Sequence, residues 1–262
     1  MTVATGVAFG ARVSTKPHIY FYMSLLCAVT AFVGFMPTFW LPMTRGAYVA
    51  SPVLAIHGLL FSTWVLFFVL QNWFAASGRI ANHRAAGLFG IALASVMTVF
   101  GYMVVINEVQ RSAAVGGLDL ALSFSILPVW HITLFAILIT LAIMNIRRPE
   151  WHKRLMLVAT ISLLDAPIAR LFIYFVAFNG QMPVPVGLPE PPPPLSGIMP
   201  WEYIVDLYLL IPIVYDWRTR GRPHIVYLFG GGSIVLLEAL EAPIGRTAIW
   251  HGVANWLVSL SG

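Results

Sequence analysis

The chain consists of long apolar blocks separated by short polar segments. Seven blocks can be drawn, and they cover Tyr20 to Met43, Pro52 to Ala76, His83 to Ile106, Leu118 to Ile146, His152 to Phe178, Trp201 to Trp217 and His224 to Ile244. A helix needs about 20 predominantly apolar residues to cross a bilayer, and each block has roughly that length or more. The pattern predicts one all-α domain over residues 1–262, a polytopic membrane protein with about seven transmembrane helices in a bundle.

The composition excludes a soluble globule. Hydrophobic residues make up 59% of the chain and charged residues 10%, which leaves too little polar surface to cover 262 residues. The formal net charge of +5 does not predict nucleic-acid binding, because the basic residues are scattered over the segments between blocks. The lipid bilayer is therefore the predicted environment. A membrane-protein partner or a second copy of the chain is compatible with the same pattern.

The basic residues alternate along the chain. They gather before the first block and in every second connection, at Arg12, Lys16, Arg79, Arg84, Arg147, Arg148, Lys153, Arg154, Arg218, Arg220 and Arg222. The connections between these carry only Arg45 and Arg111. Because cytoplasmic loops are enriched in Lys and Arg, this distribution predicts a cytoplasmic N-terminus and an external C-terminus in a cell inner membrane.

Two further segments belong to the predicted outer side. Residues 179–200 are rich in proline, including the run Pro191 to Pro194, and favour extended polyproline geometry. This segment is either an ordered flap over the outer face or a stiff spacer between helices. Residues 245–262 carry Trp250 and Trp256 among apolar residues, which predicts a short interfacial helix.

Ionisable residues inside the apolar blocks form the first candidate site. Counted from the inner helix ends at 1.5 Å per residue, they converge on one layer of the outer half, at depths of roughly 18 to 27 Å, with His57 just above it. The set comprises His57, His131, Asp165, Arg170, Asp206, Glu238 and Glu241. Such residues normally face a bundle interior, and they indicate a pocket for a divalent metal or a small polar ligand. The alternative is that Arg170 only neutralises Asp206 or Glu202.

Asp165 is the most informative member of this set. It begins the sequence Asp165-Ala166-Pro167, and a proline ring frees a carbonyl in a helix interior. The expected result is a broken helix of the kind found at buried ligand sites.

Four histidines form the second candidate site. His83 and His152 each begin a helix next to basic residues, whereas His57 and His131 lie in the outer half of the preceding helices. Facing imidazoles could hold haem b, with His83 and His152 as axial ligands of the inner group. The outer pair is less well matched, because its depths differ by roughly 9 Å. The alternative for His83 and His152 is ordinary interfacial chemistry beside lipid headgroups.

Small residues support the inner pair. His83, Gly87, Gly90, Ala94, Thr98 and Gly101 share one helix face. A stripe of this kind lets another helix or a flat ring approach closely.

Several functional classes lack their usual residues. The only lysines are Lys16 and Lys153, so the last block offers no Schiff-base lysine of the kind that retinal proteins use. Hydrolase, zinc-binding and phosphate-loop motifs are absent from the sequence. Nothing in the sequence decides whether the chain is an enzyme.

Four local motifs resemble an uncharacterised family of bacterial multi-helix inner-membrane proteins. They are His57-Gly58-Leu59-Leu60-Phe61 with Trp64 and Gln71, Gly78-Arg79 with His83-Arg84 and Gly87, the stretch from Arg147 to Met156, and the stretch from Tyr215 to His224. The resemblance covers nearly the whole chain. It implies a bacterial cytoplasmic membrane but no activity, and His131 is not part of that family's pattern. The four-histidine scheme also resembles the paired-helix logic of two-haem b-type cytochromes, without shared motifs.

Three classes of function are consistent with the sequence. They are a protein that binds a metal ion or small polar ligand in the outer polar pocket, a bis-histidine haem electron carrier, and a structural or assembly partner of a membrane complex.

Overall fold

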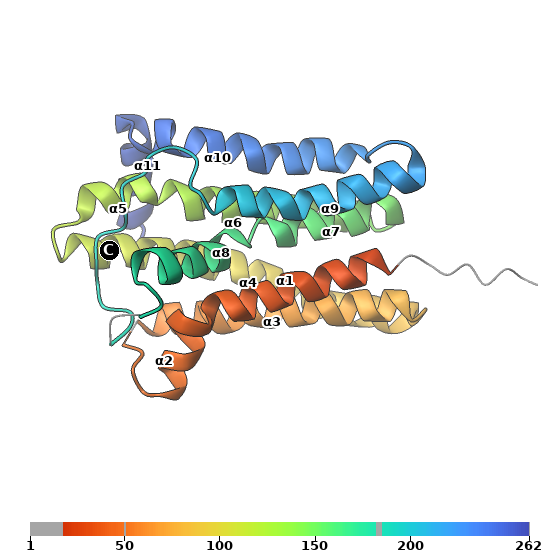
Figure 1. Cartoon of the computed structure of the whole chain (residues 1–262), viewed down its shortest axis with the longest axis horizontal. Helices are drawn as coiled ribbons and strands as arrows, with labels where there is room; N and C mark the ends of the chain where they lie inside the picture. Colours follow the sequence, from red (N-terminus) through yellow and green to blue (C-terminus); the bar gives the residue numbers. More distant parts are fainter. Residues whose placement is uncertain (1–17, 50, 182–184, 262) are drawn as a thin grey trace, which may run out of the picture.

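The computed structural model describes residues 18–49, 51–181 and 185–261, and its long segments are helical (Figure 1). The α-helices are α1 (Ile19–Phe35), α2 (Leu41–Thr44), α3 (Pro52–Ala76), α4 (Ile80–Ala113), α5 (Leu118–Phe124), α6 (Ile126–Met144), α7 (Pro149–Ile161), α8 (Asp165–Phe172), α9 (Glu202–Arg220), α10 (Gly232–Gly245) and α11 (Ala248–Ser259). Short π-helical segments are η1 (Met36–Trp40), η2 (Ile173–Ala177) and η3 (Tyr227–Gly231). Arg12, Lys16 and residues 182–184 lie outside the described residues.

Six helical segments are long and apolar enough to cross a membrane. They are Ile19–Thr44, Pro52–Ala76, Ile80–Ala113, Leu118–Met144, Pro149–Ala177 and Tyr227–Gly245. The predicted all-helical, multi-pass architecture is confirmed at this level. A seventh helix, α9, lies in the bundle, but Glu202, Asp206 and Asp216 interrupt its apolar residues.

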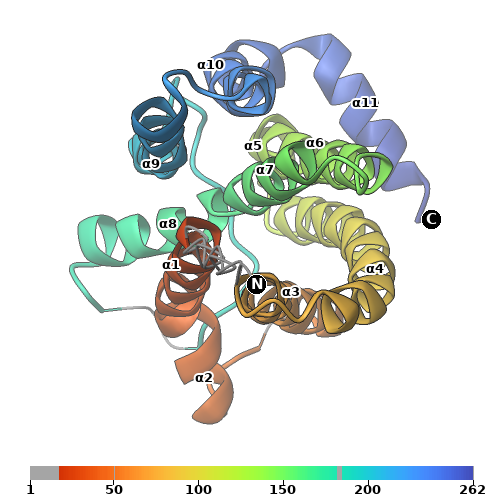
Figure 2. The same cartoon turned by 90° about the vertical axis from the view of Figure 1, so that its right-hand side faces the viewer.

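The helices form layers around α6 and α7. Viewed along the bundle, these two helices lie between α1, α3 and α4 on one side and α9 and α10 on the other (Figure 2). Large apolar side chains also cover the outside, for example Leu88, Met144 and Phe229, which are 70 to 74% exposed. A helix that is apolar all round is typical of a membrane span.

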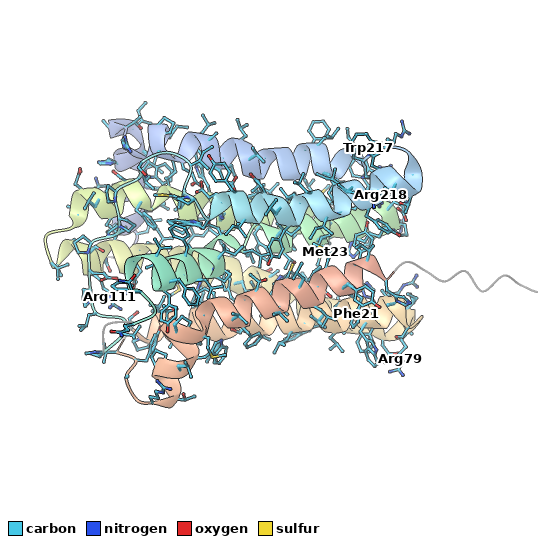
Figure 3. The ribbon with its side chains drawn as sticks, in the orientation of Figure 1. Phe21, Met23, Arg79, Arg111, Trp217 and Arg218 are labelled. Atoms are coloured by element: carbon cyan, nitrogen blue, oxygen red, sulfur yellow. The ribbon has the colours of Figure 1, made fainter. Side chains whose placement is uncertain are left out.

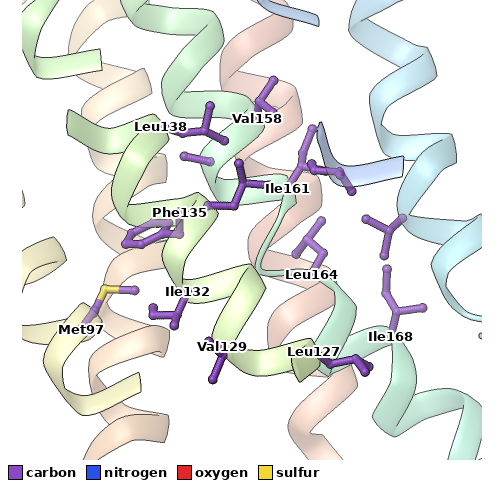
Figure 4. Close-up of a cluster of buried hydrophobic side chains, with 14 of the residues drawn as sticks. Met97, Leu127, Val129, Ile132, Phe135, Leu138, Val158, Ile161, Leu164 and Ile168 are labelled. Atoms are coloured by element: carbon purple, nitrogen blue, oxygen red, sulfur yellow. The ribbon is translucent and has the colours of Figure 1, made fainter. Parts of the chain in front are cut away.

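The core lies where α6 and α7 meet their neighbours. Figure 4 shows Met97, Ile132, Phe135, Val158 and Ile161 packed together from α4, α6 and α7. Interlocking side chains of this kind fix the helix positions, because protein interiors are densely packed. They hold the polar side chains described below at defined places.

The basic residues mark one end of the bundle. Arg79 and Arg218 lie at this end, which we call the basic end, whereas Arg111 lies at the opposite end (Figure 3). The connection between α9 and α10 is also at the basic end, and the segment between η2 and α9 is at the opposite end (Figure 1). Helix α9 runs from about the middle of the bundle to the basic end (Figure 1).

The proline-rich segment packs across the opposite end. Val186 pairs with the loop before α3, because its N–H donates to the Ala47 carbonyl at 2.9 Å and its carbonyl accepts from the N–H of Val49 at 3.0 Å. Ser112 donates to the Glu190 carbonyl at 2.9 Å. Leu195 is 3% exposed. The described part of this segment thus covers the bundle end as an ordered flap would.

The C-terminal helix α11 runs crosswise. Figure 2 shows it lengthwise where the long helices are seen end-on. Its first turn is capped by the Thr247 side chain, which accepts from the Trp250 N–H at 3.2 Å. The Trp250 indole donates to the Leu122 carbonyl at 2.9 Å and ties α11 to α5.

Candidate functional site

A helix break positions the first carboxylate. Helix α7 ends at Ile161, and α8 begins at Asp165 after a turn in which Leu164 N–H donates to the Ile161 carbonyl at 2.9 Å. Pro167 lies in the first turn of α8, where its missing N–H needs no partner. Asp165 is 8% exposed and faces the bundle interior from a helix N-terminus, which favours a carboxylate.

Two more carboxylates come from α10. Glu238 and Glu241 are three residues apart, so they share one face of the helix, and each is 2% exposed. Glu241 Oε1 lies 3.3 Å from Nε2 of His131 on α6. The charges of Asp165, Glu238 and Glu241 all act on His131. The structure therefore brings four of the seven predicted outer-layer residues together.

Glu202 is a fifth member that the sequence interpretation did not place in the site. It begins α9, is fully buried, and its Oε2 accepts from the Met199 N–H at 2.6 Å. It interacts electrostatically with Glu241 and Asp165. The available signal was its spacing of four residues from Asp206, which places both on one helix face. We call His131, Asp165, Glu202, Glu238 and Glu241 the carboxylate–histidine cluster.

The cluster has more acceptors than donors. One buried oxygen of each carboxylate has no hydrogen-bond partner, at Asp165 Oδ1, Glu202 Oε1, Glu238 Oε1 and Glu241 Oε1. The contact between His131 and Glu241 is close enough for an ion pair but does not have hydrogen-bond geometry. An ionised carboxylate accepts hydrogen bonds only, whereas a protonated one also donates. The cluster is therefore complete only with bound protons or another cation.

Other predicted members lie outside this cluster. Asp206 is at its edge, since its charge acts on Glu238. Arg170 is exposed, and the ion pairs of the described residues include none with it, so it does not neutralise Asp206 or Glu202. His57 stacks on Phe61 with ring centres 4.0 Å apart, and no hydrogen bond or ion pair of the described chain joins it to the cluster.

The predicted metal pocket lacks a preformed ligand set. Within residues 18–49, 51–181 and 185–261, no group of three or more His, Cys, Asp or Glu side chains converges closely enough to hold a metal ion. A metal would require rearrangement of the carboxylates, whereas protons would not.

The inner histidines do meet at the basic end. The rings of His83 and His152 have centres 6.2 Å apart and are nearly perpendicular, at 85°. Nδ1 of His83 lies 3.3 Å from the Gln71 carbonyl, and Nδ1 of His152 lies 2.9 Å from the Ala142 carbonyl. These contacts fix the rings and leave both Nε2 atoms without a partner on the backbone. The two histidines that the sequence analysis paired as possible haem ligands thus lie side by side.

Side chains from neighbouring helices occupy most of the space over the stripe of small residues on α4. A Cβ added at Gly90 would meet the Phe67 ring at 2.6 Å, and one at Gly101 would meet Ile132 at 2.7 Å. One at Gly87 would meet nothing within 4 Å, so open space lies one turn from His83.

Comparison of the chain with protein-family models, with curated protein sequences and with solved structures gives no match.

Proposed function

We propose that the chain is a multi-pass protein of a bacterial cytoplasmic membrane whose carboxylate–histidine cluster binds and releases protons. The observation that carries this proposal is a cluster of four buried carboxylates, each with an unpartnered oxygen, and one imidazole: Asp165, Glu238 and Glu241 act on His131, and Glu202 adjoins Glu241 and Asp165. An ionised carboxylate at the centre of a membrane helix costs about 2.5 to 3.5 kcal/mol without a partner. Four of them cannot share a single imidazole, so protons or a small cation complete the site.

The proposed membrane topology has seven crossings. The six apolar segments and α9 connect the two bundle ends alternately, with the N-terminus at the cytoplasmic, basic end and α11 on the outer interface. Two observations support a crossing by α9 together with the segment before it: that segment comes from the end opposite the basic end, and the last turn of α9, with Arg218, lies at the basic end. The cluster then lies in the outer half, as the depth count predicts.

A hydrophobic carbodiimide tests the proton content directly. This reagent adds to protonated carboxyl groups in apolar surroundings and spares ionised ones. We expect peptide mass spectrometry to find the adduct within the cluster of the purified protein, with labelling that falls as the pH rises. Asp119, whose side chain is 90% exposed, serves as the internal control and should stay unlabelled.

Proton uptake tests the function itself. Solvent-exposed carboxyl groups stay ionised above pH ~6, so uptake measured with a pH dye between neutral pH and pH ~6 reports on histidines and buried carboxyls. Asp165→Asn and Glu241→Gln should take up fewer protons than the wild type, and Asp119→Asn the same number. Equal uptake in all four proteins, together with no adduct in the cluster, would contradict the proposal.

A small cation other than the proton is the closest alternative. It would raise the thermal stability of the wild type in a panel of divalent metals and small polar metabolites, and Asp165→Asn and His131→Ala would lose that shift. Loss is expected because a neutral amide is a poor replacement for a charged oxygen ligand.

The geometry of His83 and His152 favours a second candidate, a bis-histidine haem site at the basic end. Ligating histidines usually direct their other ring nitrogen to a carbonyl or carboxylate, as both do here. The two rings lie side by side, with centres 6.2 Å apart, and both Nε2 atoms would be available to hold one iron. A bound haem would supply one-electron transfer, and these residues would hold its iron.

A further inference from the structure

A cationic cavity opens at the basic end, away from the cluster. It has a volume of about 350 Å³ and lies between α1, α7 and α9. Its walls are formed by Tyr20, Lys153, Arg154, Tyr215, Thr219 and Arg220. Three cationic side chains and three hydroxyl groups therefore surround one space, a set that matches the oxygens of a phosphate group.

The charge around this cavity is not fully neutralised. Glu150 contacts Lys153 at 2.7 Å and Arg154 at 2.6 Å, and it also pairs with Arg220. Asp216 is held by Arg154. Three cations thus face two carboxylates, which leaves one positive charge. The side chains of Lys153 and Arg220 are 32% and 41% exposed, so both can reach an incoming anion.

A separate apolar groove lies farther along α1 and α9. It has a volume of about 440 Å³ between α1, α8 and α9, and its walls include Val29, Val33, Ile168, Phe172, Ile204 and Tyr208. A hydrogen bond of 2.5 Å joins the Thr30 and Tyr208 hydroxyl groups across its floor. Because these two hydroxyl groups bond each other, neither leaves an unpaired polar group in the apolar groove.

The spacing of the two cavities fits one amphiphilic molecule. Tyr20 and Val29 are nine residues apart on α1, or roughly 13.5 Å, and Tyr215 and Tyr208 are two turns apart on one face of α9. The hydrocarbon of one leaflet is about 15 Å thick. A chain anchored in the cationic cavity therefore reaches the near edge of the apolar groove, at Val29 and Tyr208, whereas Ile168 and Phe172 lie deeper.

We propose that the cationic cavity and the apolar groove form one binding site for an anionic phospholipid of the cytoplasmic leaflet. The phosphate contacts the exposed parts of Lys153 and Arg220 beside the Glu150 carboxylate, and the end of one acyl chain enters the groove between α1 and α9. Charge complementarity selects an anionic headgroup, since each Lys or Arg near the surface attracts such lipids by about 1 kcal/mol. The site rests on the proposed orientation, with the basic end in the cytoplasm, but not on proton binding.

Native mass spectrometry of the full chain in detergent tests the headgroup. Phosphatidylglycerol should bind more tightly than phosphatidylcholine with the same acyl chains. Lys153→Gln and Arg220→Gln should each weaken phosphatidylglycerol binding about fivefold, as the loss of one cationic contact predicts. Lys153→Arg should retain it. Arg222→Gln, an exposed arginine at the same end that does not line the cavity, is the matched control and should bind normally.

A second pair of variants tests whether the groove binds the acyl chain. Val33→Trp fills the groove and should weaken binding of the long-chain lipid, whereas Leu88→Trp on the exposed face of α4 should not. Equal binding of the two lipids, an equal effect of Arg222→Gln, or no effect of Val33→Trp would overturn the proposal. Full competition by inorganic phosphate or glycerol phosphate would also overturn it, because the site would then bind a soluble anion.

Discussion

Arg154 and Asp216 form a bidentate ion pair between α7 and α9, with Nε to Oδ2 at 2.9 Å and Nη2 to Oδ1 at 2.6 Å. Both residues are buried, at 1% and 0% exposure. The parallel fork geometry is the strongest form of such a contact, and it fixes the rotation of α9 relative to α7. The same pair holds one wall of the cationic cavity.

Removing one partner of this pair should be costly. Asp216→Asn leaves the guanidinium of Arg154 buried without its charge partner, and we expect a loss of about 3 to 5 kcal/mol in unfolding free energy. The measurement is thermal or denaturant unfolding in detergent. Glu150→Gln is the control, because that side chain is 44% exposed and its pairs should contribute less than about 1 kcal/mol. Replacing both partners with Arg154→Met and Asp216→Leu should restore most of the stability; a double variant as unstable as Asp216→Asn would refute this account.

A close helix crossing supports the broken helix. A Cβ added at Gly34 on α1 would lie 2.4 Å from the backbone oxygen of Pro167 on α8. Gly34→Ala should therefore destabilise the protein by about 1 to 3 kcal/mol, since backbone atoms cannot give way as a flexible side chain can. Gly87→Ala is the matched control, because nothing lies within 4 Å of its Cβ and alanine favours the helix by up to about 1 kcal/mol. We expect Gly34→Ala to lower the thermal unfolding temperature and Gly87→Ala to raise it. Equal changes in the two variants would contradict the close crossing of α1 and α8.

The proposed orientation can be tested with single cysteines. The native Cys27 is fully buried and should give little background. Ser77→Cys lies at the basic end and Ser259→Cys in α11, and both positions are exposed. In intact cells a membrane-impermeant maleimide should label Ser259→Cys only, and permeabilisation should add Ser77→Cys. Labelling of both or neither in intact cells would mean an even number of crossings.

Some of this architecture could be predicted from local patterns. Block length and basic connections are properties of neighbouring residues, so the six apolar segments and the grouping of Arg79 and Arg218 at one end follow from them. Convergence in depth also indicated that His131, Asp165, Glu238 and Glu241 meet. Depth says nothing of rotation about the helix axis, however. That is why it could not show that Arg170, in the same layer, is exposed and forms no ion pair with them among the described residues.

Other features depend on tertiary contacts. Arg154 and Asp216 lie beside charged connections, and that sequence context is typical of solvated loop residues. Only the contact between α7 and α9 buries them. Glu202 follows Pro200 at the start of α9, and only the approach of Glu241 on α10 and Asp165 on α8 makes it part of the cluster. Such contacts depend on side chains far apart in the sequence, which spacing along one helix cannot reveal.

The histidine pair at the basic end gives the last prediction, and it separates a cofactor site from a structural contact. If His83 and His152 hold a haem, protein purified from a haem-replete host should show Soret and alpha bands in a reduced-minus-oxidised spectrum. His83→Ala or His152→Ala should abolish these bands, because each removes one axial nitrogen. His224→Ala is the matched control: its ring packs on Trp151 at the same end, with centres 5.4 Å apart, but belongs to no histidine pair, so the spectrum should persist. A colourless wild type would eliminate the haem candidate. The carbonyl contacts of the two rings would then serve only to join the start of α4 to α3 and the start of α7 to α6.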